Sequence, residues 1–593
     1  MSTDNDTLRL RLSRLTTAQR AFLARRLEGE AGPEPPAAAA RAAIPKQAPL
    51  RLELDAQGRQ IAIYPASNAQ QRIWFMQQRA ANSPVYCTPT AFELRGPLHI
   101  ARLEAALQRV IGRHDNLRTT FAMQRDELVQ RVASHSSFQL EQQTATHEPP
   151  IYEPPTDRSA AAERIIDAAA SMSFDLAAAP PFRVLLVAIE PEQHLLLINM
   201  HHILADGWSV SNLCGEVSAF YTALGAGVDV DMSQLPLQAI PVQVADYSAW
   251  QRDWLVNGAL ERQASYWQQR LAAAPEPLEW PAAGPRPATE SFRGEQCSLP
   301  IDHELLAALK ARAQQGQCTL FMLLLAAFKV LLQRCTGRTD LLVGVPIANR
   351  QRRELQGMIG MLANTLVLRT TVQVDASFEQ LLERVKQTAL EAYEHQDMPF
   401  ELLVQQLRVR RHANSTPLFQ VTFALQDYPA TELRLAGVEV TRHPVSTHTS
   451  KFDLSLAVTP VGEGLTATLE FSSELFTPQR ARDMLGHWHA LLAAIAANPA
   501  RRLAKLAALA PATSPSVPSE WHRTQRDYPR DQCIHQLFEQ QAALAPNATA
   551  VILGDISLSY GELDTRASRL AHLLRAHGVR ASALVGLRIE RSI

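Results

Sequence analysis

The chain has 593 residues, of which 46% are hydrophobic and 20% are charged, and its formal net charge is -1 at pH 7. A chain of this length exceeds a single core, so we expect roughly three to five compact units. The balanced charge excludes a global attraction for nucleic acid or for an anionic membrane. The N-terminus lacks a secretory signal, and the most apolar run, 320–328, is too short to cross a bilayer and fits a core helix. These features predict a cytoplasmic protein with neither nucleic acid nor membrane among its partners.

The six cysteines are scattered along the chain, without Cys-x-x-Cys pairs and without histidines at zinc spacing. This distribution is typical of reduced cysteines in a cytosolic protein. We therefore expect neither a disulfide nor a bound metal.

Leucines and arginines alternate in residues 8–28, and the first predicted element is a short amphipathic helix that ends at Leu27. Residues 16–19 fit a capping box for its start, and a stretch rich in proline and alanine follows up to residue 43. Residues 1–45 are therefore either a docking element for another protein or a solvated tail.

Strand-like and helix-like segments alternate from about residue 61 to residue 508, which is typical of an α/β fold. A proline-rich interruption at 272–287 favours two lobes over one continuous sheet, and a second such stretch at 511–518 ends the region. The predicted units, in chain order, are an N-lobe at 61–235, a C-lobe at 236–508, a linker at 509–532 and a further unit at 533–593.

The most informative pattern is the heptapeptide at 201–207, His-His-Ile-Leu-Ala-Asp-Gly. The apolar residues 195–198 predict a buried strand before it, Asp206 and Gly207 predict a turn, and helical periodicity begins at Trp208. Histidines on such a strand-to-helix loop are held by a rigid scaffold and can still meet a substrate. The alternative is a pair of buried histidines that backbone carbonyls satisfy.

Neighbouring side chains of an extended strand point to opposite faces, so His201 and His202 cannot both face one substrate. We expect one imidazole to act in the chemistry and the other to support the loop. An imidazole with an ordinary pKa near 6.5 can accept a proton or orient a nucleophile through a hydrogen bond.

The chain resembles the condensation domains of nonribosomal peptide synthetases, which belong to the acyltransferase superfamily that includes chloramphenicol acetyltransferase. The resemblance runs from about residue 64 to residue 508 and implies two α/β lobes, each like a chloramphenicol acetyltransferase monomer. These lobes would form a V-shaped pseudo-dimer around a central channel. The similar segments, in the order of the family's motifs, lie at 67–75, 113–119, 200–209, 246–250, 359–365, 395–401 and 414–420.

Residues 534–539 and 558–563 are similar to the opening of an adenylation domain. The unit at 533–593 is therefore expected to be a truncated piece of such a domain, whose nucleotide-binding core would follow in cis in the full-length chain. This order of units favours condensation over epimerisation. Relatives that form heterocycles carry aspartate in place of His201, so cyclodehydration is disfavoured.

The resemblance implies an enzyme of secondary metabolism that joins an acyl or peptidyl thioester to the amine of a carrier-bound aminoacyl thioester. No cofactor would be bound covalently, because phosphopantetheine arms of donor and acceptor carrier domains, or coenzyme A, bring the substrates to a monomeric domain. Two forms stay open: elongation, and a starter reaction that N-acylates the first amino acid of a lipopeptide with a fatty acyl group. The short stretch before the first motif favours donor delivery in trans in both forms. A noncatalytic carrier-binding platform and a plain small-molecule acetyltransferase are further alternatives.

For the heptapeptide, the resemblance implies that His202 faces the channel as base or positioner, while His201 is an internal hydrogen-bonding residue. Asp206 is expected to form a structural ion pair with Arg350 of the other lobe rather than a catalytic triad. Gly207 either permits an unusual backbone angle and leaves room for substrate, or is a plain turn glycine.

Other positions take their expected roles from the same resemblance. Ser209 is expected to be a cap or packing residue, and Leu362 and Ala363, where the family has phenylalanine and valine, are expected to alter the channel width. The residues expected near the substrate channel are Trp208, Asn364, Thr365 and Ser450. The residues expected to fix the first lobe are Arg72, Trp74 and Arg118, and residues 397–400 are expected to shape a loop at the lobe boundary.

Overall fold

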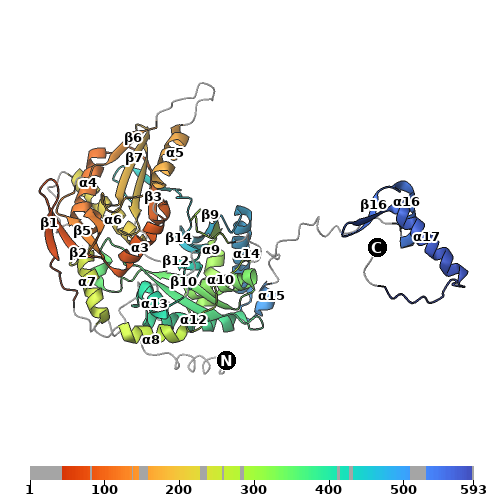
Figure 1. The fold of residues 1–593 in the computed structure, drawn as a ribbon. Helices are drawn as coiled ribbons and strands as arrows, with labels where there is room; N and C mark the ends of the chain where they lie inside the picture. Colours follow the sequence, from red (N-terminus) through yellow and green to blue (C-terminus); the bar gives the residue numbers. More distant parts are fainter. Residues whose placement is uncertain are drawn as a thin grey trace, which may run out of the picture. The chain divides into compact units, whose positions relative to one another are not determined.

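The computed structural model describes residues 43–80, 83–136, 138–145, 158–226, 235, 237–256, 260–280, 286–409, 414–426, 432–507, 529, 531–589 and 593. The chain divides into two compact units, Met1–Pro515 and Ser516–Ile593. The helix predicted to run from residues 16–19 to Leu27, and most of the linker predicted at 509–532, lie outside the described residues. The larger unit contains two lobes, each built around a mixed sheet with helices, so the predicted α/β class is confirmed (Figure 1).

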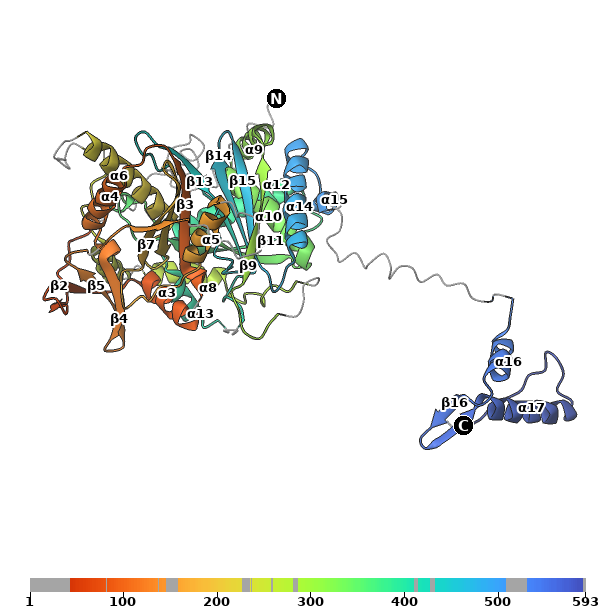
Figure 2. The same cartoon turned by 90° about the horizontal axis from the view of Figure 1, so that it is seen from above.

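The sheet of the first lobe has five strands in the order β13-β3-β8-β7-β6. Alternate residues of β8 face opposite helices: Leu196 and Ile198 pack in the cluster of α4 and α6, and Leu195 and Leu197 pack with α5. Figure 2 shows α4 and α6 on one side of this sheet and α5 on the other. Because both faces are buried, β8 is a continuous apolar run rather than an alternating one. The elements are β3 (Cys87–Arg95), α4 (Ile100–Arg113), β6 (Glu141–Thr144), α5 (Arg158–Ala170), β7 (Phe182–Glu190), β8 (Gln193–His201), α6 (Gly207–Gly225) and β13 (Glu439–His443).

A smaller sheet of the order β1-β2-β5-β4 flanks the first lobe. The helix α3 follows β2 and starts with a capping box, in which Ser67 accepts from the backbone of Gln70 and the Gln70 side chain reaches back. Helix α7 packs against β2. The elements are β1 (Arg51–Leu54), β2 (Gln60–Pro65), α3 (Asn68–Arg79), the 3₁₀ turns η1 (Pro84–Tyr86) and η2 (Asp115–Arg118), β4 (Thr119–Gln124), β5 (Glu127–Ala133) and α7 (Val244–Trp254).

The second lobe contains a six-stranded sheet of the order β11-β10-β12-β14-β15-β9, and α10 is the most deeply buried of its helices. Its strands β14 and β15 alternate, because every second residue packs under the helices and the others are partly exposed on the opposite face. The elements are α8 (Leu260–Arg270), β9 (Gly294–Ile301), α9 (His303–Gln315), α10 (Leu320–Thr336), β10 (Asp340–Ile347), α11 (Arg353–Gln356), β11 (Asn364–Thr371), α12 (Phe378–Glu394), α13 (Phe400–Leu407), β12 (Val421–Leu425), β14 (Leu454–Val461), β15 (Gly464–Ser472), α14 (Pro478–Ala497) and α15 (Leu503–Ala507).

One strand crosses between the lobes. β13 comes from the part of the sequence assigned to the C-lobe, yet it pairs antiparallel with β3 in the sheet of the first lobe, from Glu439 opposite Arg95 to His443 opposite Ala91. The predicted boundary between 235 and 236 stays a prediction. Because β13 belongs to the first sheet, no single boundary in the sequence separates the two sheets.

The smaller unit is described by itself. It consists of α16 (Ile534–Leu544), β16 (Thr549–Leu553), β17 (Ile556–Ser559) and α17 (Tyr560–Ala576), with the two strands paired antiparallel. Ser559 and Glu562 form the capping box that starts α17. This helix buries none of its residues, and Leu570 and Leu573 are more than half exposed.

Within the described ranges, no single helix has both the length and the apolar composition of a membrane span. The helices α9 and α10 meet those criteria only as a pair, and they are bent by 102° relative to one another. The apolar run at 320–328 lies in α10, where its residues from Met322 onward are buried as a core helix, as predicted.

Lys329 places an amine inside that core. Its Nζ donates to the carbonyl oxygen of Leu368 at 2.8 Å and lies 3.5 Å from that of Leu341. Burial, with a smaller contribution from Arg270, lowers the pKa of Lys329 to about 7, and Asp340 opposes the shift. The unfolded chain holds the proton up to its ordinary pKa of 10.5, so between these values the unfolded state binds more protons. The contribution of Lys329 to stability therefore rises with pH across this window.

Replacing Lys329 by methionine should stabilise the protein at neutral pH, because the buried charge is removed and the volume is kept. We expect the free energy of unfolding of Lys329→Met to exceed that of the native chain by about 1–4 kcal/mol near pH 7. The difference should narrow as the pH rises towards 10.5, because protonation of Lys329 in the unfolded native chain becomes progressively less favourable. Chemical denaturation at several pH values measures the difference, and a gap independent of pH would contradict the assignment.

Candidate active site

The loop that carries the two histidines connects β8 to α6. Asp206 is the N-cap of α6, and its Oδ1 accepts from the backbone N–H of Ser209 at 2.9 Å and from the Ser209 hydroxyl at 2.7 Å. Ser209 is thus part of a capping box, as expected of a cap residue. Gly207 is the first residue of the helix and does not have a positive φ, so of its two predicted roles the unusual backbone angle is wrong. The helix start itself, rather than a strained glycine, sets the turn.

His201 is enclosed and uses both of its ring nitrogens. Nδ1 accepts from the N–H of Ile203 at 3.2 Å, so the neutral ring carries its proton on Nε2, which donates to Oε1 of Gln77 at 3.2 Å. The rings of Tyr86 and Phe174 lie 6.1 and 6.3 Å from its centroid. Burial lowers the pKa of His201 to about 3, with smaller contributions from His202 and Lys451. The residue is a neutral, internally bonded imidazole.

His202, in contrast, uses only one of its two ring nitrogens in contacts with the described residues. Its Nδ1 lies 2.9 Å from the carbonyl oxygen of Ala205, and since a carbonyl only accepts, Nδ1 carries the proton. Nε2 of the neutral ring then has a lone pair that no described residue engages. The main-chain N–H of His202 donates to the Tyr86 carbonyl at 2.7 Å, and the side chain is partly exposed. Burial, and then the charge of Lys451, lower its pKa to about 3, so the imidazole is neutral at physiological pH.

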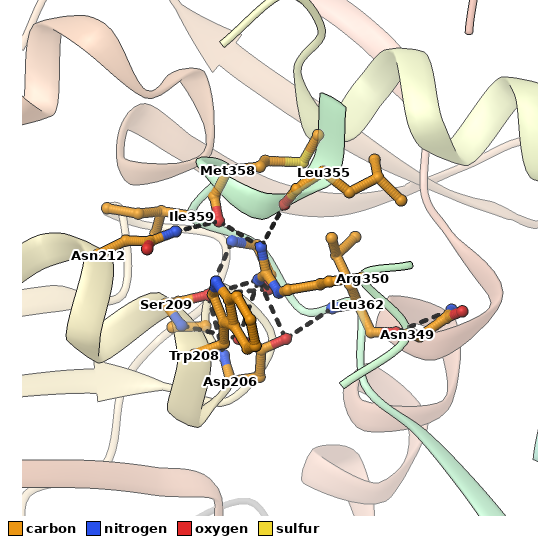
Figure 3. Close-up of polar contacts among 12 residues, drawn as sticks. Asp206, Trp208, Ser209, Asn212, Asn349, Arg350, Leu355, Met358, Ile359 and Leu362 are labelled. Atoms are coloured by element: carbon orange, nitrogen blue, oxygen red, sulfur yellow. Dashed lines mark hydrogen bonds and ion pairs between the residues drawn. The ribbon is translucent and has the colours of Figure 1, made fainter. Parts of the chain in front are cut away.

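Asp206 and Arg350 form a buried ion pair between the lobes. Arg350 lies in the connection between β10 and β11, and its Nη2 is 3.0 Å from Oδ1 and 3.2 Å from Oδ2 of Asp206. The same guanidinium donates to the carbonyl oxygens of Leu355 and Met358 at 2.7 and 2.6 Å. Figure 3 shows these contacts converging on the start of α6. The side chains of Asp206 and Arg350 are only 5% and 1% exposed.

This network argues against a catalytic triad. Asp206 directs its carboxylate at Arg350, Ser209 and the backbone N–H of Leu362, while Nδ1 of His202 faces a carbonyl oxygen instead. The carboxylate therefore fixes the loop and does not orient the imidazole directly.

The other residues expected near the channel have structural partners. Trp208 donates from Nε1 to the carbonyl of Gln356 at 2.9 Å and so joins the Arg350 connection (Figure 3). Asn364 donates to the carbonyls of residues 396 and 398 and so holds the 396–400 loop, and its Oδ1 also accepts from the N–H of Thr365. Ser450 is buried, and its hydroxyl donates to the carbonyl of Phe452 at 2.7 Å.

Two arginines predicted to fix the first lobe behave differently. Arg118 stays within it, donating to the carbonyls of residues 111 and 133 and to Asp115. Arg72 instead reaches the second lobe, where it lies 3.3 Å from Glu401 and 4.7 Å from the centre of the Phe400 ring. The prediction for Arg72 was wrong because its partners lie more than three hundred residues away in sequence.

Sequence reasoning missed Gln77, Tyr86 and Lys451, which surround the histidines. A signal existed for Gln77, because it shares the buried face of α3 with Gln70 and Ile73 at helical spacing. Lys451 stands next to Ser450, yet nothing in the local pattern indicates that it lies near the Tyr86 ring. The site thus depends on contacts between lobes that periodicity does not report.

Comparisons with known proteins agree with this geometry. A family model described as condensation domain matches residues 60–515, and one described as AMP-binding enzyme matches residues 538–593. The chain is 39% identical over 531 residues to one of the linear gramicidin synthase proteins of Brevibacillus parabrevis, and the match covers 89% of this chain and 10% of that protein. The X-domain from teicoplanin biosynthesis superposes with a TM-score of 0.65 at 26% identity, covering 74% of this chain and 96% of that chain. A four-domain nonribosomal peptide synthetase bound to AMP and glycine gives a TM-score of 0.72 at 21% identity, with coverages of 90% and 40%.

Removing one partner of the buried pair should destabilise the protein strongly. Asp206→Ala leaves the Arg350 charge buried, and we expect the free energy of unfolding to fall by about 3–5 kcal/mol. The matched control is Glu190→Ala, which breaks an ion pair with Arg158 whose side chains are 54% and 57% exposed. That change should cost at most about 1 kcal/mol. Chemical denaturation compares the two variants, and equal losses would contradict a structural role for the buried pair.

Proposed function

Since this chain belongs to the condensation domain family of nonribosomal peptide synthetases, we propose that it joins an acyl or peptidyl thioester to the amine of a carrier-bound aminoacyl thioester. Condensation domains are amide-bond-forming acyltransferases. The observation that carries the proposal is the unengaged Nε2 of His202, placed on a loop that the Asp206–Arg350 pair holds rigid. The chain spans about a tenth of the length of the first curated relative it matches, so substrates and partners are part of the proposal.

The proposed reaction needs no covalent enzyme intermediate. The amine nitrogen attacks the thioester carbonyl, the new C–N bond forms, and the C–S bond breaks as the pantetheine thiolate leaves. The proton lost by the nitrogen ends on the departing sulfur. The protein must therefore align two thioesters and exclude water, which is where large rate factors arise in bimolecular reactions.

In this proposal His202 is a hydrogen-bond acceptor for the attacking amine. An imidazolium with a pKa of about 3 gives up its proton readily, so a full proton transfer to His202 would be uphill at neutral pH. Accepting a hydrogen bond at Nε2 costs no such transfer and orients the nitrogen lone pair towards the carbonyl. The low pKa therefore favours positioning over general-base catalysis.

The proposed partners follow from this chemistry. Donor and acceptor carrier domains would present their phosphopantetheine thioesters at the His202 loop, and coenzyme A thioester is the alternative donor of the starter form. The match of residues 538–593 to AMP-binding enzymes supports an adenylation domain in cis as the source of the acceptor amino acid. The intact histidine pair, with His201 bonded internally and Nε2 of His202 left available, argues against a noncatalytic platform.

The donor class is tested by direct reconstitution. The chain is mixed with an aminoacyl carrier protein and, in separate reactions, a peptidyl carrier, a fatty acyl carrier or acyl-coenzyme A, and the carrier-bound product is read by mass spectrometry. We expect an amide product in at least one reaction. Product only from the fatty acyl donors establishes the starter form, and product from the peptidyl carrier establishes elongation. Carrier binding without product from any donor would overturn the proposed function.

Loss of the His202 side chain should reduce turnover without unfolding the protein, because only its Nδ1 is tied to the loop. We expect His202→Ala to lower the rate of amide formation by about 10²-fold or more, the cost typical of a misplaced reacting group. His194→Gln provides the control, since His194 is a buried histidine of β8, the strand that leads into the His202 loop, and its pKa is also lowered by burial. The proposed role is wrong if both variants turn over equally fast while circular dichroism reports native folding.

A further inference from the structure

Lys451 lies at the junction of the two lobes, next to the histidine loop. It precedes β14 of the second lobe, and its Nζ is 5.4 Å from the centre of the Tyr86 ring of the first lobe. The carbonyl of Tyr86 holds the main chain of His202, and its ring lies 6.1 Å from that of His201. Lys451 and His202 are therefore neighbours of the same residue.

The ammonium of Lys451 has N–H donors that no described residue accepts from. Its backbone N–H lies 3.4 Å from Oε1 of Glu470, but its Nζ makes no hydrogen bond or ion pair with any described residue. The buried lysines Lys329 and Lys386 differ, because the first donates to carbonyl oxygens and the second lies 3.5 Å from Glu383. A partly buried ammonium that lies against an aromatic face and donates no hydrogen bond to a described residue retains its hydrogen-bonding capacity for a ligand.

The charge of Lys451 acts on the reaction loop. It contributes to the lowered pKa values of both His201 and His202. A cation at this point favours negative charge developing next to the imidazoles and disfavours positive charge on them. In the proposed reaction, the atom that gains negative charge is the carbonyl oxygen of the donor thioester.

Resting on that proposed function, we propose that Lys451 donates a hydrogen bond to the donor thioester oxygen as the amine attacks, acting as the oxyanion-stabilising group opposite His202. Attack moves the carbonyl π electrons onto this oxygen, and collapse returns them as the C–S bond breaks. Lys451 keeps its protons throughout. His202 holds the nitrogen and Lys451 holds the oxygen, so the two lobes each contribute one side of the tetrahedral intermediate.

Burial lowers the pKa of Lys451 from its ordinary value, and Glu470 opposes this shift. Lys451 should therefore lose its ammonium proton, and with it this hydrogen bond, at a lower pH than a solvated lysine would. The titratable and charged groups that face Lys451 or its Tyr86 neighbour, from all elements around it, are Arg72 on α3, Arg79 on α3, Tyr86, Cys87 on β3, His201, His202, Glu290 and Glu470 on β15.

The kinetic test compares Lys451→Met with Lys451→Arg in the reconstituted reaction. We expect Lys451→Met to lower kcat by about 10²–10³-fold, the cost typical of losing one oxyanion donor, with little change in KM. Lys451→Arg should recover most of the rate and move the alkaline limb of the pH profile upward, because a guanidinium does not deprotonate in this range. The exposed Lys505 on α15 provides the control, and Lys505→Met should leave kcat unchanged. An unchanged kcat in Lys451→Met, or a raised KM alone, would overturn the proposal.

A binding test keeps this inference separate from the proposed function. A pantetheine phosphonamidate carries an anionic tetrahedral oxygen, and the matching pantetheine amide is neutral. Calorimetry should show that Lys451→Met weakens binding of the phosphonamidate by about 10²-fold, in line with one lost oxyanion donor, and leaves binding of the amide unchanged. Equal losses for both ligands would indicate a structural role and overturn the proposal, whether or not the native chain turns over.

Discussion

The buried ion pair between Asp206 and Arg350 is the interaction on which the site depends. Taking both charges out of water is costly, and the pair is tolerated because its hydrogen-bonding capacity is largely met: the carboxylate caps α6 and accepts from Leu362, and the guanidinium donates to backbone carbonyls of its own connection. A carboxylate at a helix N-terminus is further stabilised by the helix dipole. Because one partner comes from each lobe, the pair fixes the histidine loop and the lobe junction together.

The orientations of His201 and His202 follow from the position in which that ion pair holds the loop. With the N-cap in place, the backbone between β8 and α6 turns so that His201 points into the first lobe and His202 keeps one nitrogen free. Both imidazoles are neutral because burial penalises their charge. The same burial makes any nearby charge effective over a longer range than in water, which is why an unpaired lysine beside Tyr86 matters for this loop.

Local patterns were enough to predict the strand, the turn and the helix around the heptapeptide, and the core position of α10, because periodicity and capping are properties of neighbouring residues. The pairing of Asp206 with Arg350 came from family resemblance, since 144 residues separate the two in sequence. Arg72, Asn364 and the strand β13 escaped prediction for the same reason: their partners lie in segments that only the tertiary fold brings together. Of the two roles open for Gly207, the unusual backbone angle was wrong because a helix that starts at that residue needs no such angle.

The exchange of β13 between the lobes also constrains how the protein is made. One edge of β3 pairs with β8 as soon as residue 201 has been synthesised, but its other edge waits for residues 439–443. At roughly 5–20 residues per second, that edge stays open on the ribosome for about 10–50 seconds. An open strand edge is a template for wrong pairing, so during synthesis the first lobe exposes an aggregation-prone edge of β3 until residues 439–443 pair with it.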